Sequence, residues 1–270
     1  LDAVPLTAFV CLSLSHAGLG GHAVARKGLA FLRRTVRSDG GWPIDSNLRT
    51  WVTTLSARAV WRGETPPADA WKLEMGSVDD AERVAAWLVK VQTKVRHPYT
   101  GSEAGGWAWT DLPGGVPDAD DTSGALIALK HLKAFGCRTD VSVAVRSGIR
   151  WLQRLQNADG GMPTFCRGWG RLPFDRSCAD ISAHALEALA LWADVLPSVP
   201  RAMARLVRYL ERSQASDGSW SALWFGHQEA RDGRNPVVGT ARVVAALRAA
   251  LQAGSLGPEG PLAVRLLQAL

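Results

Sequence analysis

A repeated unit constrains the fold of this chain more than any other feature of its sequence. Each copy has an aromatic residue followed by Leu, in most copies a Gln four residues after that Leu, and then a Gly-rich turn that Trp usually closes. The copies span residues 28–42, 84–107, 148–162 and 206–220. They recur at intervals of roughly 55–65 residues, the length of two helices with their connections. The repeat therefore predicts a stack of helix pairs.

Segments rich in Ala, Leu and Val lie between the repeat units and predict the second helix of each pair. They cover about residues 47–62, 120–137, 179–195 and 236–253. Alternating inner and outer helices, about ten in all, predict an all-α fold of the α/α-toroid type. A closed barrel of six helix pairs would need one pair more. We therefore expect residues 1–270 to form a single α/α-barrel domain that is incomplete, as a fragment of a longer protein.

Composition and charge exclude several classes of protein. With 47% apolar and 21% charged residues, the chain is typical of a globular protein rather than a disordered one. No apolar run reaches the roughly 18 residues that span a bilayer. The four cysteines lack CxxC spacing, which argues against a disulfide scaffold or a zinc ribbon and favours a reducing, cytoplasmic location. The net charge of +6 is spread along amphipathic helices, which argues against nucleic-acid binding and weakly favours a membrane surface.

Three carboxylates within four residues form the most distinctive chemical motif. Asp118, Asp120 and Asp121 follow a proline and precede a run with helical periodicity. Like charges in a partly dry site raise the proton affinity of at least one member, so such a cluster can hold a proton at neutral pH and then deliver it. The alternative is plain helix capping by Asp121, Thr122 and Ser123. A calcium loop is disfavoured because its sixth and twelfth positions lack Gly and Glu.

A second acid motif begins the next predicted inner helix. Asp180 and His184 are four residues apart and share a helical face. We expect His184 to donate a hydrogen bond to the Asp120 carboxyl and Asp180 to fix the His184 tautomer. The alternative is a capping Asp beside an incidental His. Aromatic residues whose π-faces would stabilise carbocations accompany the motifs, although each alone is more typical of packing: Trp109, Phe165 and Trp224.

Together these motifs resemble those of a known family. Asp-x-Asp-Asp-Thr at 118–122, the repeated Gln…Gly-x-Trp units and Asp-x-x-x-His at 180–184 are similar to class II terpene cyclases of the squalene–hopene cyclase group. The resemblance runs from about residue 26 to residue 253. It implies a terpenoid cyclase/prenyltransferase-like barrel, one of the two that such cyclases carry.

The resemblance also implies roles for individual residues. Asp120 matches the family's proton-donating Asp, Asp118 and Asp121 match its flanking supports, and His184 and Asp180 match the groups beside it. Aromatic positions that line the family's cavity are matched by Trp109, Phe165 and Trp224, and by Trp51, although Val52 replaces the Asp that follows it in the family. Family members protonate a terminal alkene or epoxide of a polyisoprenoid, and rings then close in a cascade without a metal or other cofactor.

The expected substrate is squalene or a relative, with oxidosqualene or a prenyl diphosphate left open. Squalene-type members sit monotopically in one membrane leaflet, so the resemblance implies a peripheral location on the cytoplasmic side of a membrane. The expected partners are thus a hydrophobic isoprenoid, a membrane surface and a second copy of the chain in a homodimer. Nucleic acid is not among them. The basic loop at 166–178 carries Arg side chains that could meet a diphosphate.

Three other readings of the sequence make different structural demands. A protein prenyltransferase β-like subunit needs Asp-x-Cys and a distant His to bind zinc, whereas Asp175 and Cys178 are three residues apart. A class I terpene synthase needs Asp-Asp-x-x-Asp, and the nearest run, 79–82, is more typical of a charged helix start. A non-catalytic scaffold of the same fold would keep the acids only as caps that point into water.

Overall fold

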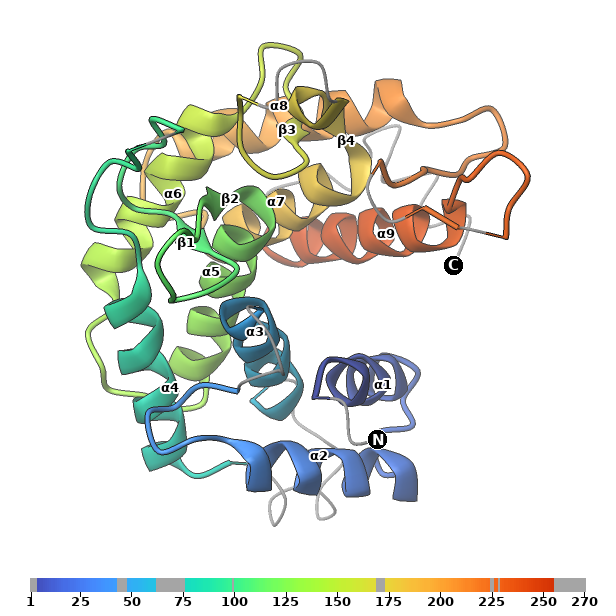
Figure 1. Cartoon of the computed structure of the whole chain (residues 1–270). Helices are drawn as coiled ribbons and strands as arrows, with labels where there is room; N and C mark the ends of the chain where they lie inside the picture. Colours follow the sequence, from blue (N-terminus) through green and yellow to red (C-terminus); the bar gives the residue numbers. More distant parts are fainter. Residues whose placement is uncertain are drawn as a thin grey trace. The chain divides into compact units, whose positions relative to one another are not determined.

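The structure is a computed structural model of the chain, and it describes residues 4–42, 48–61, 76–98, 100–168, 173–223, 226–227 and 229–254. Helices make up most of the regular structure of these residues (Figure 1). The α-helices are α1 (Val4–His16), α2 (Ala23–Thr35), α3 (Arg49–Val60), α4 (Val78–Val91), α5 (Ala119–Ala134), α6 (Ser142–Leu155), α7 (Ala179–Leu191), α8 (Val199–Ser213) and α9 (Pro236–Gln252). The short elements are β1 (Trp107–Ala108), β2 (Pro117–Asp118), β3 (Met162–Pro163), η1 (Pro173–Asp175) and β4 (Ser177–Cys178). The predicted all-α class is confirmed.

The chain divides into two compact units. The first unit is Leu1–Gln92, Trp107–Gly115 and Gly124–Val145, and the second is Thr93–Gly106, Val116–Ser123 and Arg146–Leu270. Within the first unit, α1 packs against α2 and α3. Within the second, α7 packs against both α8 and α9, and also against β3 and β4 (Figure 1). Whether residues 1–270 are one barrel domain stays a prediction.

The predicted second helices all form, as α3, α5, α7 and α9. Helix α5 begins at Ala119, earlier than predicted, and α7 ends at Leu191, earlier than the predicted 195. The structure also shows the role of the acidic run at residues 79–82. The Ser77 hydroxyl caps α4 by accepting a hydrogen bond from the backbone N–H of Asp80, and the Asp80 carboxylate accepts one from the Ser77 backbone N–H. The run is therefore a charged helix start, as predicted, and not a magnesium motif.

Helices α2, α4 and α8 end in the same way. The residue after each helix has an extended backbone, and these residues are Val36, Gln92 and Gln214. The left-handed glycines come later, in the turn itself: Gly40, Gly105, Gly160 and Gly218 have φ between 84° and 114°. The glycine thus does not itself stop the helix. It turns the chain back towards the core after an extended residue has already ended the helix.

The repeat residues make recurring hydrogen bonds. The Gln92 and Gln156 side-chain amides donate to Ala144 O and Ala202 O, at 2.9 and 3.1 Å, in the first turn of the next outer helix. Gln214 donates to Gly218 O within its own turn. The buried indole N–H groups of Trp42, Trp107 and Trp220 donate back to Leu32 O, Leu88 O and Leu210 O. The repeat residues therefore hold the end of each helix to its own turn and, through Gln92 and Gln156, to the next outer helix.

A further recurring bond was not visible in the sequence. The backbone N–H at the closing position of three units donates to a hydroxyl near the start of the following inner helix. The pairs are Trp42 with Thr53 at 2.9 Å, Met162 with Ser182 at 2.8 Å, and Trp220 with Thr240 at 3.0 Å. We call these bonds the hydroxyl ties. Each one fixes an inner helix against the turn that precedes it.

The four cysteines are free and buried. Among the described residues, no helix has the length and apolarity that a membrane crossing requires.

Candidate active site

The acid motif lies where β2 runs into α5. Because α5 begins at Ala119, Asp118 precedes the helix and Asp121 lies in its first turn. The Asp118 Oδ1 atom accepts a hydrogen bond of 2.9 Å from the Asp121 backbone N–H. Asp118 is therefore the cap of α5. The sequence had named Asp121, Thr122 and Ser123 as caps, and that was wrong because the helix starts earlier. Ser123 instead donates to Ala119 O at 2.6 Å.

The second acid motif lies at an equivalent junction, where β4 runs into α7. The antiparallel pairing of Met162 with Cys178 closes the loop between the two strands. The segment after β3 also holds the first junction, since Phe165 O accepts a 2.7 Å hydrogen bond from the Ala119 backbone N–H. The β2–α5 junction is thus bonded to the segment that follows β3, and β3 pairs with β4, the strand that runs into α7.

Asp120 is the centre of the resulting cluster. His184 Nδ1 lies 2.6 Å from Asp120 Oδ1, and Arg242 Nη1 donates to the same oxygen at 3.2 Å. The side chains of Asp120 and His184 are 7% and 12% exposed. The predicted pairing of His184 with the Asp120 carboxyl is present, and the carboxyl is not bathed in solvent.

Asp180 does not have the place that the sequence gave it. Its carboxylate is fully buried, and among the described residues neither oxygen has a hydrogen-bond partner of good geometry. No hydrogen bond therefore joins it to His184, and the expected role in fixing the His184 tautomer is not supported. Its electrostatic neighbours are instead Arg242, the Cys178 thiol and Asp120. The N-cap position of α7 is held by Cys178, whose side chain makes no capping hydrogen bond, and not by Asp180.

The carboxyls of the cluster differ in proton affinity. Burial raises the pKa of Asp118 to about 7, and burial with the nearby Asp118 charge raises the pKa of Asp121 well above its usual range. Burial also raises the pKa of Asp180. Burial acts the same way on Asp120, but there the charges of Arg242 and His184 outweigh it and hold the pKa well below its usual range. The cluster thus holds a proton at neutral pH, as predicted, but on the neighbours of Asp120 and not on Asp120 itself.

These pKa values predict an uncommon dependence of stability on pH. A carboxyl whose pKa is higher in the folded state than its unfolded value of about 3.9 takes up protons on folding, so its contribution to stability is lost as the pH rises. Because the pKa of Asp118 is about 7, we expect the free energy of unfolding to fall between about pH 4 and pH 7. Asp120 acts with the opposite sign, but only below about pH 4.

Urea unfolding at a series of pH values measures this effect. The Asp118→Asn variant keeps a side chain that can cap α5, so it should flatten the slope and be more stable than the parent at about pH 8. A parent protein that gains stability across the same interval would contradict the assignment of buried protons to this cluster.

Arg242 is the member of the cluster that the sequence analysis missed. It lies on α9, far along the chain from Asp120, and nothing local marks it. The hydroxyl ties, which only the structure reveals, explain its place in the repeat. His184 comes two residues after Ser182, and Arg242 comes two residues after Thr240. Alignment of the inner helices on their tied hydroxyls places His184 and Arg242 at the same position of the repeat.

The structure describes three of the four predicted aromatic residues. Phe165 is half-buried, and its ring lies 6.0 Å from that of Phe174. Trp51 and Trp109 belong to the first unit, in segments joined by a 2.9 Å bond from the Thr50 backbone N–H to Trp109 O. Trp224 lies outside the described residues. That these four residues bind a substrate stays a prediction.

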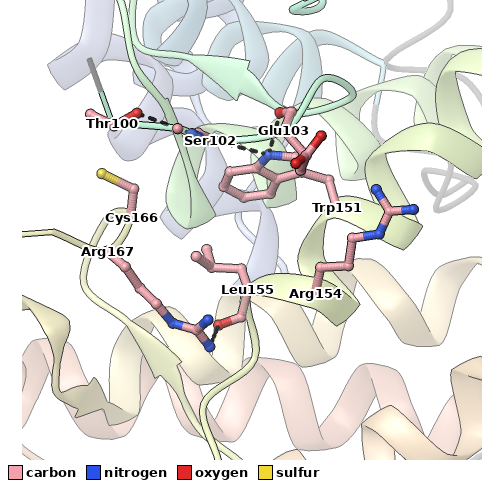
Figure 2. A pocket seen from close by; sticks show the side chains of 9 residues that line it. Thr100, Ser102, Glu103, Trp151, Arg154, Leu155, Cys166 and Arg167 are labelled. Carbon is pink, nitrogen blue, oxygen red and sulfur yellow. Dashed lines mark hydrogen bonds between the residues drawn. The ribbon is translucent and has the colours of Figure 1, made fainter. Parts of the chain in front are cut away.

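A pocket in the second unit is separate from this cluster. Its volume is about 190 Å³, and it lies beside the Trp151 indole, Leu155 and Cys166 (Figure 2). Pockets that hold drug-sized ligands are typically about 300–1,000 Å³, so this one is too small for a long isoprenoid. The Arg167 guanidinium at its edge donates to Leu155 O and Gln156 O at the end of α6. Arg167 is thus engaged in capping a helix, which weakens its case as a diphosphate ligand.

No group of three or more His, Cys, Asp or Glu side chains in the described part of the chain could hold a metal ion. The zinc site that a protein prenyltransferase β-like subunit requires is therefore not found among Asp175, Cys178 and the other described residues.

Known proteins share both the sequence and the fold. The model of the squalene-hopene cyclase C-terminal domain family matches residues 50–258. The chain is 28% identical over 234 residues to the squalene–hopene cyclase of Alicyclobacillus acidocaldarius, covering 78% of this chain and 33% of that protein. It is 28% identical over 252 residues to the enfumafungin synthase EfuA of Hormonema carpetanum, covering 83% of this chain and 18% of that protein. The chain thus spans a third or less of the length of these curated relatives.

The fold comparison is independent of close sequence similarity. The type II terpene cyclase MstE from Scytonema aligns with 93% of this chain and 74% of its own, with a TM-score of 0.60 at 15% sequence identity. At this identity the likeness shows the fold alone, and the fold is the α/α type of the terpene cyclases. The family model, by contrast, matches more than half of the chain and includes both acid motifs. The chain therefore belongs to the squalene-hopene cyclase C-terminal domain family, within the class II terpene cyclases.

Proposed function

We propose that the protein is a protonation-initiated cyclase of a linear isoprenoid, with squalene or a relative as substrate and Asp120 as the general acid. The observation that carries the proposal is the buried carboxyl of Asp120 with the His184 imidazole 2.6 Å away. A carboxyl that a cationic partner polarises is a stronger acid, because its conjugate base is stabilised. Protonation of an alkene demands such an acid.

The two oxygens of Asp120 divide the work in this proposal. Oδ1 receives both His184 and Arg242, whereas no hydrogen bond to Oδ2 is found among the described residues. The transferable proton therefore sits on Oδ2. It moves to the terminal carbon of the alkene while the π electrons form the new C–H bond, which leaves a carbocation at the adjacent carbon. Successive double bonds then attack, and the final cation loses a proton or takes up water.

The proton must reach Asp120 from a neighbour. Asp120 is ionised at rest, and the carboxyls with raised pKa values are Asp118 and Asp121. We propose that this pair stores the proton and that Asp120 is loaded before each turnover. Burial favours the protonated form of this pair, because two neighbouring buried carboxylates would repel each other if both were ionised.

A scaffold without catalysis is the second reading, and it fits less well. It requires acids that serve only as caps in contact with water. Asp118 does cap α5, but Asp120 and Asp121 are buried, and one Asp121 oxygen has no partner among the described residues. Buried ionisable groups without structural partners are costly and are typical of functional sites.

The proposal includes a location on the cytoplasmic side of a membrane, at its surface. A long hydrocarbon substrate partitions into lipid, so the enzyme must meet it there. The outer helices support this with exposed basic side chains, Arg146, Arg150 and Arg154 on α6 and Arg201 and Arg208 on α8. Such side chains attract anionic lipid headgroups. Assembly as a homodimer stays a prediction.

The test is incubation of the full-length protein in D₂O with squalene, oxidosqualene and geranylgeranyl diphosphate in turn, followed by mass spectrometry of the extracted products. We expect a cyclic product from one of them that carries one deuterium, delivered by the exchangeable acid. A cyclic product without deuterium would mean that protonation does not start the reaction. No product from any of the three would reject the isoprenoid substrates named here.

A further inference from the structure

Arg242 makes an interaction that the proposed function does not by itself require. Asp120 already has a donor in His184, yet α9 brings a guanidinium to the same oxygen, with Nη1 at 3.2 Å from Oδ1. The Arg242 side chain is 24% exposed and that of Asp120 is 7% exposed. A cation held this close to a buried carboxylate acts on it with little screening by water.

The repeat explains how Arg242 comes to this place. Ser182 and Thr240 hold the same hydroxyl tie at the start of α7 and α9. Residues two positions later project from equivalent points of two inner helices that pack against each other. His184 and Arg242 therefore approach Asp120 from equivalent positions of the repeat. The hydroxyl tie of each helix fixes that helix relative to the turn before it.

We propose that Arg242 is a positioning residue of the Asp120 acid: together with His184 it fixes Oδ1, stabilises the carboxylate, and leaves Oδ2 as the site of the transferable proton. The part that concerns proton transfer rests on the proposed function. The part that concerns the charge of Asp120 does not, because it follows from the contacts alone.

The other charged groups at the cluster would not substitute for Arg242. Those that face Asp120 or Arg242 are Asp118 and Asp121 at the start of α5, and Asp180, His184 and Glu187 on α7. Tyr209 on α8 and the Cys178 thiol lie beside Asp180. All of these except His184 are acids or weak acids. Without Arg242, the His184 imidazole would be the only basic group among these described neighbours to oppose the acids, and like charges would raise the pKa of Asp120.

Carboxyl-carbon NMR of the ¹³C-aspartate-labelled protein tests the charge directly, with Asp120 assigned through its loss in Asp120→Asn. In Arg242→Gln we expect the pKa of Asp120 to rise by about 1 to 3 pH units. Arg242→Lys keeps the charge and should leave the pKa close to that of the parent. Arg248→Gln is the matched control, because it removes one positive charge from an exposed position of the same helix. An Asp120 pKa that is unchanged in Arg242→Gln overturns the proposal.

Kinetics with the turned-over isoprenoid form the second arm. We expect kcat of Arg242→Gln to fall roughly 10- to 100-fold with KM unchanged, and Arg242→Lys to restore most of it. A rise in KM alone would mean that Arg242 binds substrate, which overturns the positioning role. If Arg242→Gln does not fold, Arg242→Lys provides the test. Suppose that the pKa of Asp120 rises in Arg242→Lys as far as it rises when His184 is replaced by a neutral residue. The positive charge at position 242 would then not be what lowers the pKa of Asp120. Because the NMR arm needs no substrate, a protein that cyclises nothing would reject the proposed function and leave the Arg242 result standing.

Discussion

Replacing Asp120 by Asn is expected to lower the rate of isoprenoid cyclisation by at least about 1,000-fold. An amide cannot deliver a carboxylic acid proton to an alkene, and neither neighbouring carboxyl receives both His184 and Arg242. Product formation by the full-length variant, measured by mass spectrometry against the parent, gives the result. Substrate binding should persist, since the change alters no apolar group.

The stability of this variant should fall, but moderately. On the sequence alone, Asp120→Asn would be nearly neutral for thermal stability. Arg242 changes that expectation, because the guanidinium loses the charge of the acceptor to which it donates at 3.2 Å, while Asp180 and Glu187 remain beside it. We expect a loss of about 1–3 kcal/mol in the free energy of unfolding.

Asp194→Asn is the matched control, because Asp194 is an exposed aspartate just beyond α7. It should change neither turnover nor stability measurably. If Asp120→Asn keeps more than about a tenth of the parent rate, a general acid at this position is ruled out. The deuterium transfer would then have to be sought at Asp118 or Asp121.

Replacing Trp107 by Ala is expected to lower the free energy of unfolding by about 3–5 kcal/mol. The indole is fully buried in the first unit, and its N–H donates to Leu88 O at 2.8 Å. The substitution therefore leaves a cavity and removes the side-chain hydrogen bond to Leu88 O near the end of α4. Urea unfolding followed by circular dichroism measures the loss as a lower midpoint.

Trp107→Phe separates the two contributions. It keeps most of the ring and removes the donor, so we expect a cost of about 1–2 kcal/mol. A Trp107→Ala variant that is no less stable than Trp107→Phe would show that the ring does not pack as described, and would remove the repeat Trp from the list of groups that hold the fold.

The repeat made the helices predictable from the sequence, because a helix that buries one apolar face has apolar residues at regular helical spacing. The inner helices α3, α5, α7 and α9 all lie close to their predicted ranges. The start of α5 was less predictable. Asp118 and Asp121 can both cap a helix, and only the 2.9 Å bond between them decides which one does.

The candidate site was predictable as far as its motifs were local. Acids and imidazoles are rare in and beside apolar helices, and here they form two short motifs. This is how the sequence identified Asp118, Asp120, Asp121 and His184. Arg242 was not identified in this way, since its contact with Asp120 depends on how α9 packs against α7. For Asp180 the helical spacing was right, but spacing says nothing about which polar group a side chain reaches.

The hydroxyl ties have a consequence for how such a chain can acquire different chemistry. Each tie fixes the rotation of one inner helix relative to the turn before it, so the residue two places further on keeps a constant orientation with respect to that turn. A point replacement there swaps imidazole for guanidinium, amide or hydrocarbon without disturbing the framework. A single inserted residue between tie and functional group would instead swing it by about 100° and aim it elsewhere. The ties thus allow the residue at this position of the repeat to change while the helix that carries it stays in place.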